Sequence, residues 1–159
     1  MRRFLKFLHT AAALGLSGGL AAYLLVLLAA PADADLNTRL ALRDSLAFVA
    51  SWLILPSMLV VLASGLLAMA AHYPFVNAPW VWVKAISGLL IFEATLASVD
   101  APAQQAVAAL NKAIAGTVTE ADLATLVRDE WGAWWMLLAL SLANVALGIW
   151  RPRFGIRRD

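Results

Sequence analysis

The chain has 159 residues, of which 63% are hydrophobic, with a net charge of +2 and no cysteine. Without cysteine there are no disulfides, thiolate metal sites or thiol catalysis, and the basic residues do not form the patch that binds nucleic acid. One soluble core of this length could not bury so much apolar surface, so the composition predicts an integral membrane protein with a lipid bilayer as its partner.

Four apolar runs, each about long enough to cross a bilayer, dominate the chain. They cover residues 4–30, 45–71, 80–99 and 131–150. We therefore predict an all-α fold, a polytopic membrane four-helix bundle that forms a single domain over residues 1–159.

The first run, residues 4–30, carries small residues at every fourth position, namely Ala11, Gly15 and Gly19. Such a stripe lets a neighbouring helix approach closely. A secretory signal peptide is the competing interpretation, but the run exceeds the roughly 7–15 residues of a signal's apolar region. The segment is therefore interpreted as a membrane span, and Pro31 ends it.

The second run, residues 45–71, follows a segment of mixed charge that begins its helix in water. Pro56 lies inside the run and predicts a kink, because proline donates no backbone hydrogen bond. A turn with two prolines covers residues 72–79, and Trp80 then marks re-entry into the membrane at headgroup level.

The third run ends near Pro102, and the connection over residues 102–130 is interpreted as a short periplasmic helical insert. Residues 103–115 are rich in alanine with apolar residues at helical spacing, and Gly116 provides a stop. Thr119, followed by acidic residues, is typical of the start of a second short helix.

Basic residues lie mainly before the first run and after the last. By the positive-inside rule, both termini are then cytoplasmic in a bacterial-type inner membrane. These residues are Arg2, Arg3 and Lys6 at the N-terminus and Arg151, Arg153, Arg157 and Arg158 at the C-terminus.

Two polar residues, His9 and Lys84, lie near the cytoplasmic ends of the first and third runs. The Lys84 side chain can reach the headgroups from its depth. The His9 imidazole can hydrogen-bond a carbonyl of a neighbouring helix, reach the interface, or ligate the iron of haem b among small residues. Nearby Arg and Lys side chains, including Arg151 and Arg153, could pair with haem propionates.

Glu93 and Asn144 are the other polar residues deep in the runs. Nine residues separate Lys84 from Glu93, which puts them on opposite faces of a helix. Glu93 can be protonated in a helix contact or line a proton path, and Asn144 is typical of a hydrogen bond between helices.

Short motifs in all four runs resemble the superfamily of CopD-like and HemJ-like membrane proteins. They are the segments Lys6-Phe7-Leu8-His9, Leu55-Pro56-Ser57-Met58, Trp80-Val81-Trp82-Val83-Lys84 and Ile149-Trp150-Arg151-Pro152-Arg153.

The resemblance implies a haem-associated bundle in which His9 is the haem ligand and Lys84 is needed for activity. Residues 93–95 lack the aromatic and histidine residues of HemJ-like proteins, and residues 131–136 lack their acidic-asparagine signature. The chain therefore fits an uncharacterised branch better than a protoporphyrinogen oxidase.

These observations predict a membrane protein that binds haem b through His9, with Lys84, Arg151 and Arg153 near the propionates. It would act in membrane redox or haem-pathway chemistry, with enzymatic activity left open and Lys84 as a catalytic candidate. Two alternatives remain: an accessory subunit of a membrane complex, with membrane protein partners or a homo-oligomer, and a small transporter or metal permease that uses Glu93 and Asn144.

Overall fold

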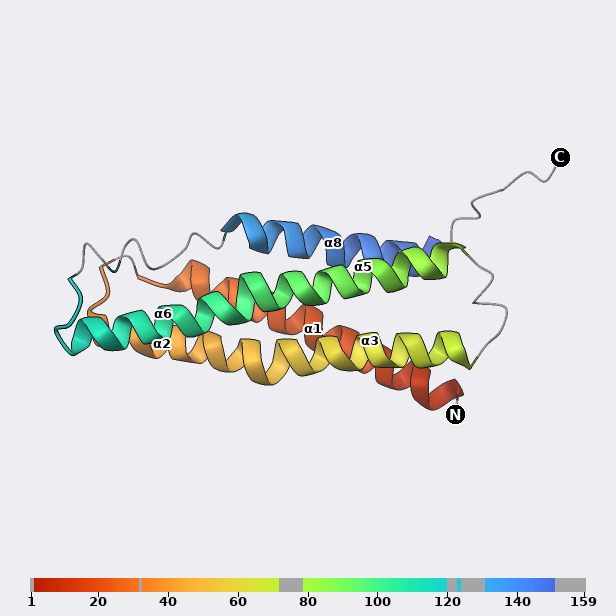
Figure 1. Ribbon diagram of the computed structural model, residues 1–159, viewed down its shortest axis with the longest axis horizontal. Coiled ribbons are helices and arrows are strands. Elements are labelled where there is room, and N and C mark those ends of the chain that lie inside the picture. The colour runs from red at the N-terminus through yellow and green to blue at the C-terminus, as the bar shows by residue number, and fades with distance from the viewer. Residues whose placement is uncertain (1, 32, 72–78, 120–122, 124–130, 151–159) are drawn as a thin grey trace.

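The computed structural model describes residues 2–31, 33–71, 79–119, 123 and 131–150. Within these residues the chain is helical and contains no strand, which confirms the all-α prediction (Figure 1). Three helices in the described part, Arg3–Ala29, Leu36–Ala70 and Val81–Ile114, are long and apolar enough to cross a membrane. A fourth apolar helix, Trp134–Trp150, is shorter.

Helix α1 (Arg2–Ala29) packs closely against α3 (Leu55–Ala70) and the turn before it, as the small-residue stripe predicts. A Cβ atom on Gly19 would lie 2.9 Å from Cγ1 of Ile54, and one on Gly15 would lie 2.6 Å from Oγ of Ser57. Side chains at these two positions would therefore separate the helices.

The second long helix is built from α2 (Leu36–Val49), a π-helical turn η1 (Ala50–Ile54) and α3. It begins at Asp35, whose carboxylate accepts a hydrogen bond from the backbone N–H of Thr38 at 2.6 Å. This hydrogen bond lowers the pKa of the exposed Asp35 carboxyl, because it favours the charged form.

The third long helix continues past the point where the sequence predicted its end. Helix α5 (Pro79–Thr95) passes through a π-helical turn η2 (Leu96–Asp100) directly into α6 (Ala101–Ile114). Both π-helical turns end two residues before a proline, Pro56 or Pro102. The wider π-helical turn shifts the backbone hydrogen-bond register just before the proline. Each helix therefore continues past its proline without ending.

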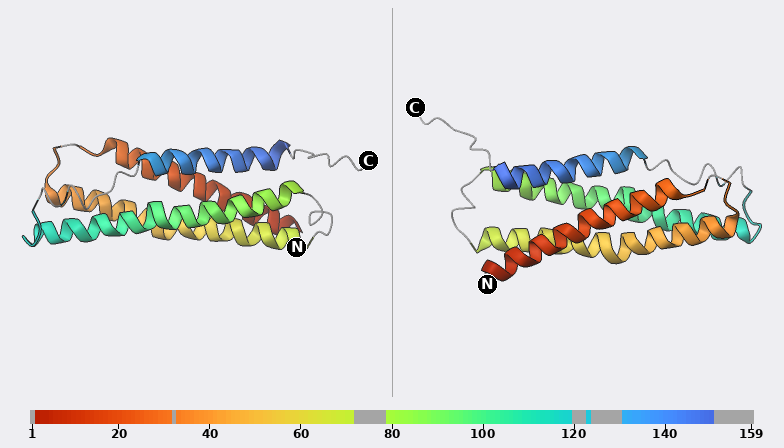
Figure 2. Two further views of the ribbon diagram at one scale, coloured as in Figure 1. Left: turned by 45° about the horizontal axis from the view of Figure 1, so that its top comes forward. Right: turned by 180° about the vertical axis from the view of Figure 1, so that it is seen from behind.

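Helix α6 packs against α2, and this pair extends beyond the end of α1 (Figure 2). Leu110 and Ala109 are buried between the two helices, together with Leu123. Gly116 follows α6 with a φ of 70°, which confirms the predicted helix stop. The second short helix expected after Thr119 falls largely outside the described residues.

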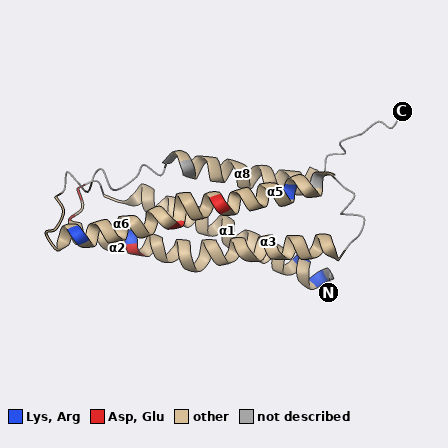
Figure 3. Ribbon diagram, viewed as in Figure 1, with Lys and Arg blue, Asp and Glu red and all other residues tan. Residues whose placement is uncertain are grey.

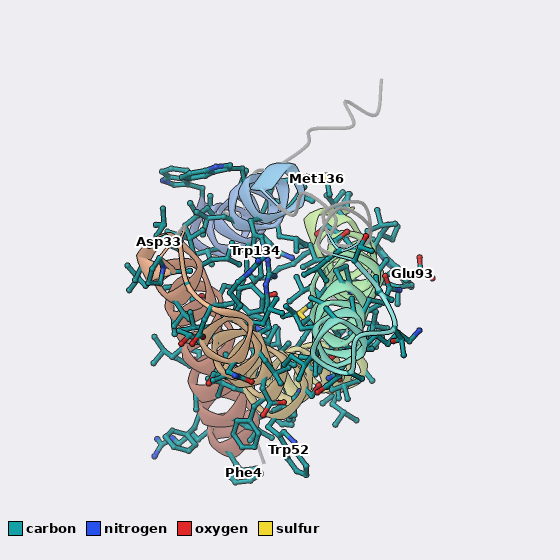
Figure 4. All side chains as sticks on the ribbon, turned by 90° about the vertical axis from the view of Figure 1, so that its left-hand side faces the viewer. Phe4, Asp33, Trp52, Glu93, Trp134 and Met136 are labelled. Atoms are coloured by element: carbon teal, nitrogen blue, oxygen red, sulfur yellow. The ribbon has the colours of Figure 1, made fainter. Side chains whose placement is uncertain are left out.

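Helix α8 (Trp131–Trp150) lies beside α5 and closes the bundle. Its Trp134 side chain points into the middle of the bundle (Figure 4) and stacks on Tyr23 of α1, with ring centroids 4.3 Å apart. Both side chains are buried in the core, which also contains Ile54, Val99 and Leu137. This core fills the middle of the bundle and leaves the end where α1 begins more open.

Charged positions in the described helices lie mainly toward the two ends of the molecule (Figure 3). The α2 and α6 pair carries them at one end, and the start of α1 carries them at the other. Most of the helical surface between them is uncharged.

Candidate ligand cavity

A cavity of about 530 Å³ lies at the end of the bundle where α1 begins. The helices form two pairs there, α1 beside α3 and α5 beside α8 (Figures 1 and 2), and the cavity lies between the pairs. Apolar side chains form most of its wall, among them Leu16, Met58, Leu62, Met69 and Ile91. Its polar lining residues are Lys6, His9, Ser17, Lys84, Ser141 and Asn144.

His9 reaches the cavity from α1 and is held by α3. Its Nδ1 lies 3.0 Å from the carbonyl oxygen of Val61 and 3.0 Å from Oγ of Ser64. The Val61 carbonyl can only accept a hydrogen bond, so Nδ1 carries the proton in this arrangement. The lone pair of the neutral ring is therefore on Nε2, which is the atom left for a ligand or a metal.

The Ser64 hydroxyl completes this arrangement. It donates its only proton to the carbonyl of Val60 at 2.5 Å, so its oxygen is left to accept from His9. Ser64 is buried, and a Cβ on Gly65 beside it would lie 3.5 Å from Cε1 of His9, an ordinary van der Waals contact, so the imidazole lies directly against this turn of α3. The ring is thus fixed in both position and tautomer.

Lys84 enters the same cavity from α5. Its Nζ lies 2.5 Å from the position that a Cβ on Gly148 would occupy, so this glycine of α8 provides the space for the ammonium group. With Lys6 and His9, the described lining contains three basic side chains and no acidic one. The cavity is therefore suited to a ligand that carries negative charge.

Asn144 and Ser141 form the polar part of the α8 wall. The Asn144 Nδ2 donates to Oγ of Ser87 on α5 at 3.3 Å, so Asn144 makes the hydrogen bond between helices that its sequence position predicts. The Asn144 Oδ1 and Ser141 Oγ atoms are buried and have no hydrogen-bond partner among the described residues.

Glu93 does not join this site. It is exposed and points away from the bundle (Figure 4), on the opposite side of α5 from Lys84 as their spacing predicts. Arg151 and Arg153, the other residues predicted near the propionates, and His72 lie outside the described residues. Of the predicted site residues, the structure thus brings together His9, Lys84 and Asn144.

Sequence reasoning missed the residues that position these three. Neither Ser64 nor Ser87 stands out in the sequence as a hydrogen-bond partner of these residues. Hydroxyl residues are common in apolar helices, and no spacing rule indicates which one faces a histidine on another helix.

The described residues contain no group of three or more His, Asp or Glu side chains that could hold a bare metal ion. A metal held mainly by a macrocycle needs fewer protein ligands, because haem iron takes one or two axial side chains. The His9 imidazole alone meets that lower requirement.

No protein-family model, curated protein or solved structure matches this chain. The geometry of the cavity and the chemistry of its lining residues are therefore the basis for a functional proposal.

Proposed function

We propose that the protein is an integral membrane protein of the inner membrane, with both termini in the cytoplasm and the α2–α6 pair on the periplasmic side. The apolar faces of its helices support the membrane location, and the basic residues Arg2, Arg3 and Lys6 support the cytoplasmic N-terminus. Large apolar side chains point outward along the bundle, with exposed fractions of 69% for Phe7, 70% for Leu14 and 71% for Ile149. A soluble monomer rarely exposes such continuous apolar surface, whereas lipid covers it without cost.

We further propose that the cavity holds haem b and that the protein acts in membrane redox or haem-pathway chemistry. The observation that carries the proposal is the fixed His9 ring. Its Nδ1–H is bonded to the Val61 carbonyl and Ser64 hydroxyl, and its Nε2 lone pair is left for iron. Metal-bound histidines commonly have such a second partner, which orients the ring and sets its tautomer.

The other lining residues fit the same group. The volume of about 530 Å³ lies within the range of small-molecule sites, roughly 300–1,000 Å³. The cavity lies between two helix pairs, its wall is mostly apolar like a macrocycle, and Lys6 and Lys84 in its lining could pair with haem carboxylates. Haem would supply one-electron chemistry there, with His9 as the residue that would hold its iron and the apolar walls limiting the access of water.

An absorption spectrum of the purified protein, expressed with a supply of haem, tests this proposal. We expect a Soret band at near-stoichiometric haem and distinct α and β bands after reduction with dithionite. His9→Ala should lose the haem, because His9 is the one imidazole among the described residues that line the cavity. Thr10→Ala, an exposed neighbour on the same helix, is the matched control and should retain it. A full Soret band in the His9→Ala protein would exclude His9 as the ligand.

A further inference from the structure

Glu93 lies deep within the part of the bundle that would cross the membrane. Helix α8 sets the scale, because it runs antiparallel to α5 (Figure 1) and its 20 residues rise about 30 Å, the thickness of the hydrocarbon core. Asn144 of α8 bonds to Ser87 of α5, so these two residues lie at one level. Glu93 follows Ser87 by six residues, which places it about 11 Å from one end of α8 and about 18 Å from the other.

At this depth the Glu93 side chain faces outward. It is exposed and points away from the bundle (Figure 4). Ionisable side chains within membrane helices almost always face the bundle interior or a water-filled cavity and pair with another group, because hydrocarbon disfavours their charged form. In a single copy of the chain, Glu93 would instead face hydrocarbon.

The residues that follow Glu93 on the same side of this long helix are small. Ala97 and Ala101 come four and eight residues later, and both are exposed. Residues four apart lie on one face of a helix. Other exposed positions of α5 carry large side chains, with exposed fractions of 58% for Ile86 and 59% for Leu90. Small residues beside a polar one are typical of the surface where two membrane helices pack, because they let the backbones approach closely.

A second copy of the chain provides a matching surface. All copies insert with the same orientation, so Glu93 lies at the same depth in each, and a two-fold axis along the membrane normal can bring two such surfaces together. A neutral carboxyl has one O–H donor and a carbonyl acceptor, so two carboxyls can donate to each other. The described basic residues lie in the cavity or toward the ends of the molecule (Figure 3), so the chain itself offers Glu93 this pairing.

We propose that the face formed by Glu93, Ala97 and Ala101 joins two copies of the chain within the membrane, with hydrogen bonds between the two Glu93 carboxyls. This dimer rests on the proposed membrane location and is independent of haem. The interface leaves the cavity free, because Lys84 of the cavity lining and Glu93 lie on opposite sides of α5.

Cysteine cross-linking of the full-length protein in native membranes tests the contact, because the chain has no cysteine of its own. Ala97→Cys should form a disulfide-linked dimer of twice the chain mass when oxidised with copper phenanthroline. Ala22→Cys is the matched control and should stay monomeric. Ala22 is an exposed residue of α1 beside Tyr23, which stacks on Trp134 at the level of Ala97, so the control has a similar depth on the other helix pair.

Two substitutions of Glu93 test the hydrogen bonds. In the Ala97→Cys protein, Glu93→Gln should keep the cross-link, because an amide also donates and accepts. Glu93→Leu has a similar volume and can do neither. In the chain without cysteine, it should weaken the dimer by about tenfold, as measured by sedimentation equilibrium in detergent.

Three results would overturn the dimer while leaving the membrane location and the haem proposal intact. They are a yield of Ala97→Cys dimer no higher than that of Ala22→Cys, a cross-link to a different protein, and a Glu93→Leu dimer as tight as that of the unchanged chain. A chain that remains in solution without detergent would overturn the membrane location as well. A dimer that carries no haem would contradict the haem proposal alone.

Discussion

His9 derives its proposed role from Nε2, the ring nitrogen that its hydrogen bonds to α3 leave available. His9 and Asn144 are each held by a serine of a neighbouring helix, Ser64 for His9 and Ser87 for Asn144. Both residues line the same cavity. Each serine donates its proton to a backbone carbonyl, which leaves its oxygen only as an acceptor. Two serine hydroxyls therefore orient the His9 ring and the Asn144 amide.

This arrangement predicts the effect of Ser64→Ala. The His9 ring would lose one of two partners on Nδ1, so its orientation and basicity would be less well defined. We expect the affinity for haem to fall by roughly tenfold, the lower end of the effect of outer-shell partners. Titration of haem into the apoprotein, followed at the Soret band, measures this. Ser45→Ala is the control. It removes an exposed hydroxyl of α2 whose hydrogen bond goes to the carbonyl of Ala41 in the same helix. Equal affinities in the two variants would contradict the role of Ser64.

At the scale of elements, the close contact of α1 with the η1 and α3 segments positions His9 against its partners. Gly19 lies against buried Ile54, whereas a Cβ on Gly18, its neighbour, would meet nothing within 4 Å. The two glycines occupy the same helix, so they differ in packing and not in helix propensity.

Gly19→Ala and Gly18→Ala should therefore have opposite effects. Gly18→Ala should stabilise the protein by about 0.5–1 kcal/mol, because alanine favours a helix over glycine. Gly19→Ala should destabilise it by about 1–3 kcal/mol, because the new methyl group overpacks a filled contact. Thermal unfolding in detergent, followed by circular dichroism, compares the two. A Gly19→Ala protein as stable as Gly18→Ala would contradict the close contact.

Hydrogen bonds link the second and third long helices where their two π-helical turns lie side by side. Oγ of Ser51 in η1 donates to the carboxylate of Asp100 in η2 at 2.7 Å, and Gln104 donates to the same hydroxyl at 3.1 Å. These bonds satisfy polar groups beside the two widened turns. They also hold η1 of the second long helix against η2 and α6 of the third.

At the scale of the whole molecule, the proposed topology puts the start of α1 and the α2–α6 pair on opposite sides of the membrane. Because the chain has no cysteine, single cysteines can report this directly. In spheroplasts, a membrane-impermeant maleimide should label Asn111→Cys on the exposed side of α6. It should label Arg3→Cys only after lysis. Labelling of position 3 in intact spheroplasts would contradict the cytoplasmic N-terminus.

The whole-molecule shape also explains why the cavity lies at one end. Tyr23 and Trp134 fill the middle of the bundle with stacked rings. Toward the start of α1, smaller residues such as Ala13, Gly65 and Gly88 line the space between the helix pairs. The large side chains therefore close one part of the bundle, and the small ones leave the other open.

The sequence by itself determined the helical class, the apolar segments and the residues worth testing. Hydropathy and helical spacing are local properties, so they located His9, Lys84 and Asn144 and placed Glu93 on the face opposite Lys84. The stop at Gly116 was predictable for the same reason, since it depends on the conformational freedom of one residue.

Only the tertiary structure decided that the third long helix continues through Pro102, and that His9, Lys84 and Asn144 share one cavity. Both results depend on how helices are rotated and stacked against one another, and each residue turns its helix by about 100°. Small differences in register therefore decide whether Ser64 meets His9 or lipid. No local pattern carries that information, because packing between distant segments determines it.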